Sequence, residues 1–229
     1  MSHLACMFDV DNTLLDNDRI KHDFGVKLDA LLGSGTSQHY WQVYETLRDE
    51  LGYADYLATV QRCWKDAGRD PRWLPSAGFM LDCHFPEYLY PGALAALEHV
   101  RELASTWIVS DGDAVFQPHK VRHSGLWQAF DGNVLIYRHK QHELADIEAR
   151  CQADHYVMID DKLRLLDAMK QQWGPRLTTV WVRQGHYALS TDGHAPADIT
   201  IEHIGDLVTF SGDDLRRAAT DTTAVKETP

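Results

Sequence analysis

The chain has 229 residues, 44% of them hydrophobic, which is enough to bury a core in one or two domains. It carries 22 basic and 34 acidic residues, and the resulting net charge of −12 argues against nucleic acid or an anionic membrane as its main partner. No apolar run of about 18 residues and no signal-like leader is evident, so we expect a cytoplasmic protein with no membrane partner. The four cysteines are scattered without a CxxC pair, which indicates neither a zinc site nor a disulfide framework.

Four apolar runs and a weaker fifth predict buried strands. They cover residues 4–10, 106–111, 155–160, 177–185 and 197–201. Near-continuous apolar runs are typical of strands that are buried on both faces in a parallel sheet. Helical patterns lie between the runs, over residues 90–104, 142–151 and 163–174. This alternation predicts an α/β fold, with a Rossmann-like open parallel sheet and helices on both faces.

The segment from residue 16 to residue 88 breaks this alternation. It lacks clear strands and is rich in helix formers and aromatic residues, which predicts a helical insertion after the first strand. The core is therefore expected to comprise residues 1–15 and 89–210. The remaining residues, 211–229, form a polar tail that we expect to fray or to be disordered.

Residues suited to phosphate or metal chemistry stand at the ends of the first three runs. The first run ends in Asp9 and Asp11, the second in Ser110, and the third in Asp160 and Asp161. If these strands are parallel neighbours, their carboxyl ends meet at one edge and place the four acids and the hydroxyl in one crevice. Such a group of acids needs a cation, and hard oxygen ligands suit Mg²⁺ better than zinc.

Three stretches resemble motifs of the haloacid dehalogenase-like (HAD) hydrolase superfamily. "DVDNT" fits the first motif, DxDxT, and "WIVSD" is similar to the second, a hydrophobic strand that ends in Ser or Thr. "YVMIDD" is similar to the fourth, a hydrophobic strand that ends in paired acids. The resemblance runs from residue 4 to about residue 185, in the family's order. Asn12 departs mildly from the pattern, because many members carry Gly there and Asn tolerates a left-handed backbone.

The resemblance implies a Mg²⁺-dependent enzyme that works through an aspartyl-phosphate. Asp9 would attack phosphorus, and Asp11 would protonate the leaving oxygen and then activate water. Two residues of separation are expected to place both side chains on one strand face. Mg²⁺ would be held by Asp9, Asp160 and the main-chain carbonyl of Asp11, with Asp161 as a further ligand or a helix cap. Ser110 would donate to a phosphoryl oxygen.

Two lysines compete for the family's phosphate-binding position. Lys120 lies in a helix expected soon after the second strand, and Lys140 precedes the predicted helix 142–151. Family architecture puts the lysine at the start of the latter helix, so the resemblance assigns Lys140. Asp111 and Asp113 either cap the helix that follows them or line the substrate entrance, and Asp111 is kept as a substrate-binding candidate.

The insertion resembles the helical cap that follows the first motif in one large subgroup, which implies a small phosphorylated metabolite as the substrate. Asp16 and Asp18 are expected to be solvated residues of the hinge. Phosphonatase relatives use a lysine of the insertion, but no pattern marks Lys21, Lys27 or Lys65 as buried. Most aromatic residues of the insertion are expected to pack in its core, with one or two facing the site.

The favoured interpretation is a small-molecule phosphatase that acts as a monomer or a homodimer. A halide leaving group needs no proton, so the acid at Asp11 counts against a 2-haloacid dehalogenase. A phosphomutase and a non-catalytic protein that binds a phosphorylated metabolite remain as alternatives. The intact acid pair, Asp9 and Asp11, counts against the non-catalytic alternative.

Overall fold

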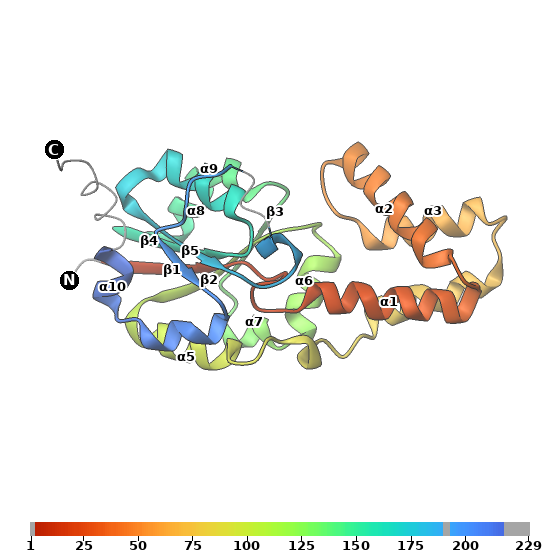
Figure 1. The fold of residues 1–229 in the computed structure, drawn as a ribbon, viewed down its shortest axis with the longest axis horizontal. Helices are drawn as coiled ribbons and strands as arrows, with labels where there is room; N and C mark the ends of the chain where they lie inside the picture. The colour runs from red at the N-terminus through yellow and green to blue at the C-terminus, as the bar shows by residue number, and fades with distance from the viewer. Residues whose placement is uncertain (1–2, 190–192, 218–229) are drawn as a thin grey trace.

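The computed structural model describes residues 3–189 and 193–217, and it contains a six-stranded sheet (Figure 1). The strands are β1 (Leu4–Phe8), β2 (Ser105–Asp111), β3 (Val134–Tyr137), β4 (His155–Asp160), β5 (Leu177–Val182) and β6 (Ile199–Ile201). Every neighbouring pair is parallel, in the order β3-β2-β1-β4-β5-β6. The predicted Rossmann-like α/β fold is confirmed, and the first three predicted strands are adjacent.

Helices cover both faces of the sheet. Alternate residues of β1 point to opposite faces, so Cys6 and Phe8 join one buried cluster whereas Ala5 and Met7 join another. The first cluster is closed by α5 (Ala93–Leu103), α6 (Phe116–His123) and α7 (Leu126–Ala129). The second is closed by α8 (Leu144–Cys151) and α9 (Leu163–Trp173). Burial of β1 on both faces explains why its sequence is apolar without alternation.

Strand β3 is absent from the sequence prediction. It has four residues, all of them half-buried, and within the described part of the chain it pairs with β2 alone, at the edge of the sheet. A short edge strand lacks the long apolar run that marks a central one. Strands β1 and β5 also end earlier than predicted, at Phe8 and Val182.

Four helices follow β1 and extend away from the sheet (Figure 1). They are α1 (Asn17–Leu32), α2 (Thr36–Leu51), α3 (Tyr56–Asp66) and α4 (Leu74–Leu81). Aromatic contacts hold them together, such as Phe24 against Tyr40 and Tyr44 against Tyr56, with ring centroids 5.0 Å apart in each pair. This segment, called the helical insertion below, matches the predicted helical content of residues 16–88. Its role as a separate cap domain stays a prediction.

The carboxyl-terminal segment differs in part from the prediction. Residues Gly212–Arg217 form helix α10, and Leu215 is buried against the core, so order continues beyond residue 210. The rest of the predicted tail, residues 218–229, lies outside the described residues. Short 3-10 turns complete the fold at Pro71–Trp73, Phe85–Tyr88, Lys140–His142, Gly174–Arg176, His186–Leu189 and Ile204–Thr209. Within residues 3–189 and 193–217, no helix combines the length and apolarity that a membrane span requires.

Candidate active site

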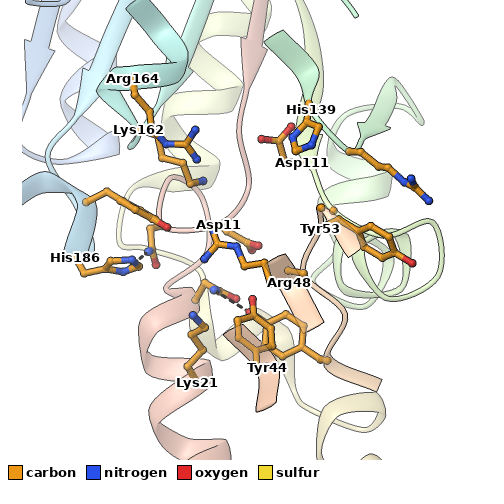
Figure 2. A pocket seen from close by; sticks show the side chains of 18 residues that line it. Asp11, Lys21, Tyr44, Arg48, Tyr53, Asp111, His139, Lys162, Arg164 and His186 are labelled. Carbon is orange, nitrogen blue, oxygen red and sulfur yellow. Dashed lines mark hydrogen bonds between the residues drawn. The ribbon is translucent and has the colours of Figure 1, made fainter. Parts of the chain in front are cut away.

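A cavity of about 140 Å³ lies where the helical insertion meets the carboxyl edge of the sheet (Figure 2). Asp11 and Asp111 line it from the sheet side, and Tyr44 and Tyr56 line it from the insertion. In an open α/β sheet, ligands bind beyond the carboxyl ends of strands where the strand order reverses, which here is around β1. The cavity therefore lies in the expected position for a ligand site.

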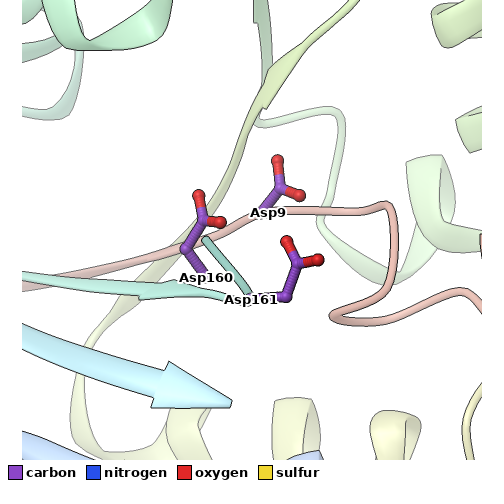
Figure 3. Close-up of side chains that lie close together, drawn as sticks. All are labelled: Asp9, Asp160 and Asp161. Carbon is purple, nitrogen blue, oxygen red and sulfur yellow. The ribbon is translucent and has the colours of Figure 1, made fainter. Parts of the chain in front are cut away.

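Three buried carboxylates lie together beside this edge (Figure 3). Asp9, Asp160 and Asp161 each offer an oxygen, and these atoms lie within 4.8 Å of one another. Strands β1 and β4 are hydrogen-bonded neighbours, and the Asp9 N–H donates to the carbonyl of Ile159 at 2.9 Å. Parallel pairing of two apolar strands that end in acids thus brings these side chains together.

Lys140 reaches into this cluster from the connection between β3 and α8. Its Nζ lies 2.7 Å from Asp9 Oδ1 and 2.5 Å from Asp160 Oδ2, and it also donates to the Val109 carbonyl at 3.2 Å. Burial acts to lower the pKa of Lys140, but the charges of Asp160 and Asp9 outweigh it and raise the pKa. Lys140 therefore stays charged beside the candidate nucleophile.

Lys162 is a further member of the cluster that sequence reasoning missed. Its Nζ lies 3.4 Å from Asp161 Oδ1 and 3.8 Å from Asp9 Oδ2. Burial acts to raise the pKa of Asp9, but the charges of Lys140 and Lys162 outweigh it and hold the pKa below its usual value. The position of Lys162 directly after the paired acids, in "DDK", was the available signal. Both lysines keep Asp9 in the ionised form that a nucleophile requires.

Lys120 has a different partner from Lys140. It is fully buried on α6, and its Nζ lies 2.5 Å from Asp11 Oδ1 and 3.3 Å from Asn17 Oδ1. The side chain of Asp11 remains 22% exposed, so it is accessible from the cavity. The two competing lysines are thus both at the site, and Lys140 is the one that contacts Asp9.

The expectation that Asp9 and Asp11 share a strand face is wrong. Strand β1 ends at Phe8, and the chain then turns so that the Val10 carbonyl accepts N–H groups from Leu14 and Leu15 at 2.9 Å. Asn12 takes the left-handed conformation within this turn, with φ of 60°. Because the turn replaces the strand, Asp9 and Asp11 reach different lysines.

The end of β2 supplies Ser110 and Asp111. Ser110 is buried, and its hydroxyl accepts a hydrogen bond from Gln117 Nε2 at 3.0 Å. Asp111 accepts the backbone N–H of Lys140 at 2.8 Å, and burial raises the pKa of Asp111. Asp113 instead accepts the N–H of Phe116 at 2.7 Å, at the start of α6. Asp113 therefore binds the start of the helix that follows it, whereas Asp111 lines the cavity.

The hinge acids are held by specific hydrogen bonds. Asp16 caps α1 by accepting the N–H of Arg19 at 2.9 Å. The expectation of a solvated side chain is wrong for Asp18, which is half-buried and accepts the His186 N–H at 2.8 Å and Asn12 Nδ2 at 3.2 Å. Burial acts to raise the pKa of Asp18, but these hydrogen bonds outweigh it and lower the pKa. Asp18 therefore joins the insertion to the loop after β5.

The buried acids fit a divalent cation. Both carboxylate oxygens of Asp161 and the Oδ2 of Asp9 are buried without a hydrogen-bond partner among the described residues. Around them, five ionisable acids face three ammonium groups, which leaves two negative charges without a counter-charge when all are ionised. Those acids are Asp9, Asp11, Asp111, Asp160 and Asp161, and the ammonium groups belong to Lys120, Lys140 and Lys162. Carboxylate oxygens are the ligands that Mg²⁺ prefers.

Comparison with known proteins agrees with this geometry. Residues 3–171 match the family model for haloacid dehalogenase-like hydrolases. A structure from Burkholderia xenovorans LB400, described as a haloacid dehalogenase-like hydrolase, shares 47% sequence identity. It aligns with a TM-score of 0.87 over 94% of this chain and 99% of that chain. No curated protein matches the chain.

More distant solved structures share the fold. A haloacid dehalogenase-like family hydrolase from Xanthomonas campestris is 15% identical, with a TM-score of 0.68 over 98% of this chain and 95% of that one. L-2-haloacid dehalogenase from Xanthobacter autotrophicus, solved with chloropropionic acid covalently bound, is 16% identical. Its TM-score is 0.62 over 90% of this chain and 96% of that chain. At these identities the likeness concerns the fold alone.

Proposed function

The chain belongs to the haloacid dehalogenase-like hydrolase family, and we propose that it is a phosphatase that hydrolyses small phosphate monoesters. One observation carries this proposal. An ionised carboxylate, Asp9, and a second carboxylate, Asp11, each contact a buried lysine at the same sheet edge, and Asp11 is open to the cavity. This arrangement provides a nucleophile and a separate proton donor for an alkoxide leaving group.

The reaction proceeds in two steps at phosphorus. An oxygen of Asp9 attacks phosphorus and the bond to the ester oxygen breaks, while that oxygen takes a proton from Asp11. In the second step Asp11 takes a proton from water, whose oxygen attacks the aspartyl-phosphate; inorganic phosphate leaves and Asp9 is restored. Lys140 stabilises the negative charge at the phosphoryl group, and the Ser110 hydroxyl donates to a phosphoryl oxygen.

Asp9, Asp160 and Asp161 are the residues that would hold a divalent cation. The family resemblance implies the Asp11 carbonyl as a further ligand. Bound Mg²⁺ would offset the repulsion between the attacking carboxylate and the phosphate. The haloacid dehalogenase alternative uses a carboxylate nucleophile as well, but a halide leaves without a proton. Asp11, with its dedicated buried lysine, favours an oxygen leaving group and therefore a phosphatase.

A panel of phosphate monoesters tests the proposal, with Mg²⁺ or with EDTA. We expect release of inorganic phosphate that needs Mg²⁺ and falls by at least ~10³-fold in Asp9→Asn and ~10²-fold in Asp11→Asn. Asp49→Asn, at an exposed position of α2, is the matched control and keeps full activity.

Three further outcomes separate the alternatives. Release of chloride from 2-chloropropionate, without phosphate release from any ester, assigns the dehalogenase reaction instead. Phosphate release that survives in Asp9→Asn contradicts the covalent mechanism. An ester that binds but is never hydrolysed, in the wild type with Mg²⁺, supports the non-catalytic binding role.

A further inference from the structure

Five basic side chains line the cavity, although the chain as a whole carries a net charge of −12. Lys21 and Arg48 enter from α1 and α2 of the insertion, and Lys162 enters from the sheet edge (Figure 2). Arg138 and Arg164 complete the cationic lining. Among the described residues, Asp11 and Asp111 are the acids of this lining. Lys120 donates to Asp11, and the backbone N–H of Lys140 donates to Asp111.

Several of these cations lack an acidic partner. Among residues 3–189 and 193–217, no carboxylate lies within ion-pair distance of Lys21, Arg138 or Arg164. Lys21 packs its ammonium group 5.3 Å from the Trp41 ring and 5.1 Å from the Tyr44 ring. Burial lowers the pKa of Lys21. A half-buried, unpaired lysine that lines a cavity indicates an anionic ligand.

Arg48 stands beside Lys21 in this lining. Its only acidic contact among the described residues is Glu45 at 3.2 Å, an exposed pair on one helix that contributes little energy. The charge of Arg48 acts to lower the pKa of Lys21, since like charges repel. The positions of both groups are thus better explained by an external anion than by internal pairing.

The phosphoryl group already has cations of its own. Lys140 and Lys162 lie at Asp9, and Lys120 lies at Asp11, all at the sheet edge. Lys21 and Arg48 come instead from the insertion, at the opposite side of the cavity. Lys162 lines the cavity and lies 3.8 Å from Asp9, so a substrate with its phosphate at Asp9 would extend into the cavity toward Lys21 and Arg48.

We propose that the substrate is a small phosphate monoester with a second anionic group, which Lys21 and Arg48 bind. The proposal rests on the phosphatase function proposed above and names its substrate class. A carboxylate or a second phosphate supplies the required oxygens, because both accept charge-assisted hydrogen bonds from ammonium and guanidinium groups. The cavity volume of about 140 Å³ keeps the two anionic groups only a short carbon chain apart.

Calorimetric titration with three phosphonates of matched length tests the proposal without turnover. The compounds are propylphosphonate, 3-phosphonopropionate and ethane-1,2-diphosphonate, each titrated into the wild-type protein with excess Mg²⁺. We expect at least one of the two compounds with a second anion to bind about tenfold or more tightly than propylphosphonate, as one charge-assisted hydrogen bond provides. The compound with the larger gain in affinity over propylphosphonate shows whether the second group is a carboxylate or a phosphate.

Two substitutions locate the preference. In Lys21→Met and in Arg48→Met, the affinity ratio between the preferred compound and propylphosphonate falls about tenfold. Lys27→Met is the matched control, because Lys27 is an exposed lysine of the same helix outside the cavity, and it keeps the wild-type ratio. The two substitutions lie on different helices, so if one variant fails to fold, the other still tests the proposal.

Equal affinity for the three phosphonates in the wild type overturns the proposal, as does a preference that persists in both variants. These failures are distinct from failure of the phosphatase function. If esters are hydrolysed but the protein shows no preference for a second anion, the proposal for Lys21 and Arg48 fails and the phosphatase function stands. An anion preference that depends on Lys21 and Arg48, without hydrolysis of any ester, supports the binding site and removes the phosphatase function.

Discussion

At the residue scale, buried lysines pair with the carboxylates of the site. Lys140 contacts Asp9 and Asp160, whereas Lys120 contacts Asp11. Burying a charge is costly unless it is paired, and removal of one partner leaves the other charge uncompensated. The lysines therefore contribute both to stability and to the positions of the acids, and these contributions can be separated by substitution.

Lys140→Met should destabilise the protein and slow the reaction. The substitution leaves the buried carboxylates of Asp9 and Asp160 without their nearest cation, which costs about 3–5 kcal/mol. It also removes charge stabilisation at the phosphoryl group, with an expected loss of about 10²–10³-fold in kcat. Urea unfolding and initial rates measure the two effects. Lys65→Met, at an exposed position of α3, serves as the control, and a stable, active Lys140→Met variant contradicts the assignment.

Lys120→Met tests a positioning role. Lys120 holds Asp11 at 2.5 Å, so its loss should misplace the proton donor and lower kcat by about 10²-fold, with a much smaller change in KM. Lys120→Arg retains a charged donor and should recover part of the lost kcat. If KM rises while kcat is unchanged, Lys120 acts in substrate binding and not through Asp11.

At the scale of elements, the loop after β5 joins the insertion to the sheet. Its His186 N–H donates to Asp18 at the start of α1, and Tyr187 lines the cavity. Gly185 makes the close approach possible, with φ of 68° and no side chain between the loop and Asn12. A single position thus controls how closely two segments, more than 170 residues apart, approach at the site.

Gly185→Ala should open this contact. A Cβ at residue 185 would lie 2.5 Å from Asn12 Cγ, so either the loop or the turn after β1 must move. Gly68→Ala is a matched control, because Gly68 has φ of 66° and no neighbouring atom within 4 Å of an added Cβ. Thermal unfolding should show a cost of about 1 kcal/mol for Gly68→Ala from backbone strain, and about 1–3 kcal/mol more for Gly185→Ala. If both variants lose the same unfolding free energy, the loop after β5 moves away from Asn12 without further cost.

The sequence predicts those elements whose burial leaves a local signature. Central strands such as β1 and β4 are recognisable because burial on both faces makes them continuously apolar, and their terminal acids identify the site. Strand β3 lies at a half-buried edge and carries no such signature. The partner of Lys120 and the cationic lining of the cavity were not predictable, because each contact joins residues far apart in the chain. Local patterns do not encode such distances.

At the scale of the whole molecule, two parts share one cavity. The carboxyl edge of the sheet supplies the acids and their lysines, and the helical insertion supplies Lys21, Arg48 and an aromatic wall. The chain is acidic overall, so a cationic cavity concentrates anions at one place on the molecule. Beside that cavity, the buried carboxylates of Asp9, Asp160 and Asp161 repel one another, and a divalent cation would offset this repulsion.

Mg²⁺ should therefore raise the thermal stability of the wild-type protein. Ligand present at about 100 times its Kd stabilises the folded state by about 2.7 kcal/mol. For a chain of this length, that corresponds to a rise of about 5–10 °C in Tm. Differential scanning calorimetry with Mg²⁺ and with EDTA measures the change.

Asp161→Asn makes the test specific to the buried acids. Both carboxylate oxygens of Asp161 lack a hydrogen-bond partner among the described residues, and Lys162 Nζ lies 3.4 Å from Oδ1, so the neutral amide removes a buried charge that is only partly compensated. In EDTA we expect the variant to be at least as stable as the wild type, because the repulsion from Asp9 and Asp160 is relieved. With Mg²⁺ its Tm should rise by less than half of the wild-type increment, because a ligand is lost. An equal increment in both proteins would place the cation elsewhere, and no increment in the wild type would contradict a magnesium site at this sheet edge.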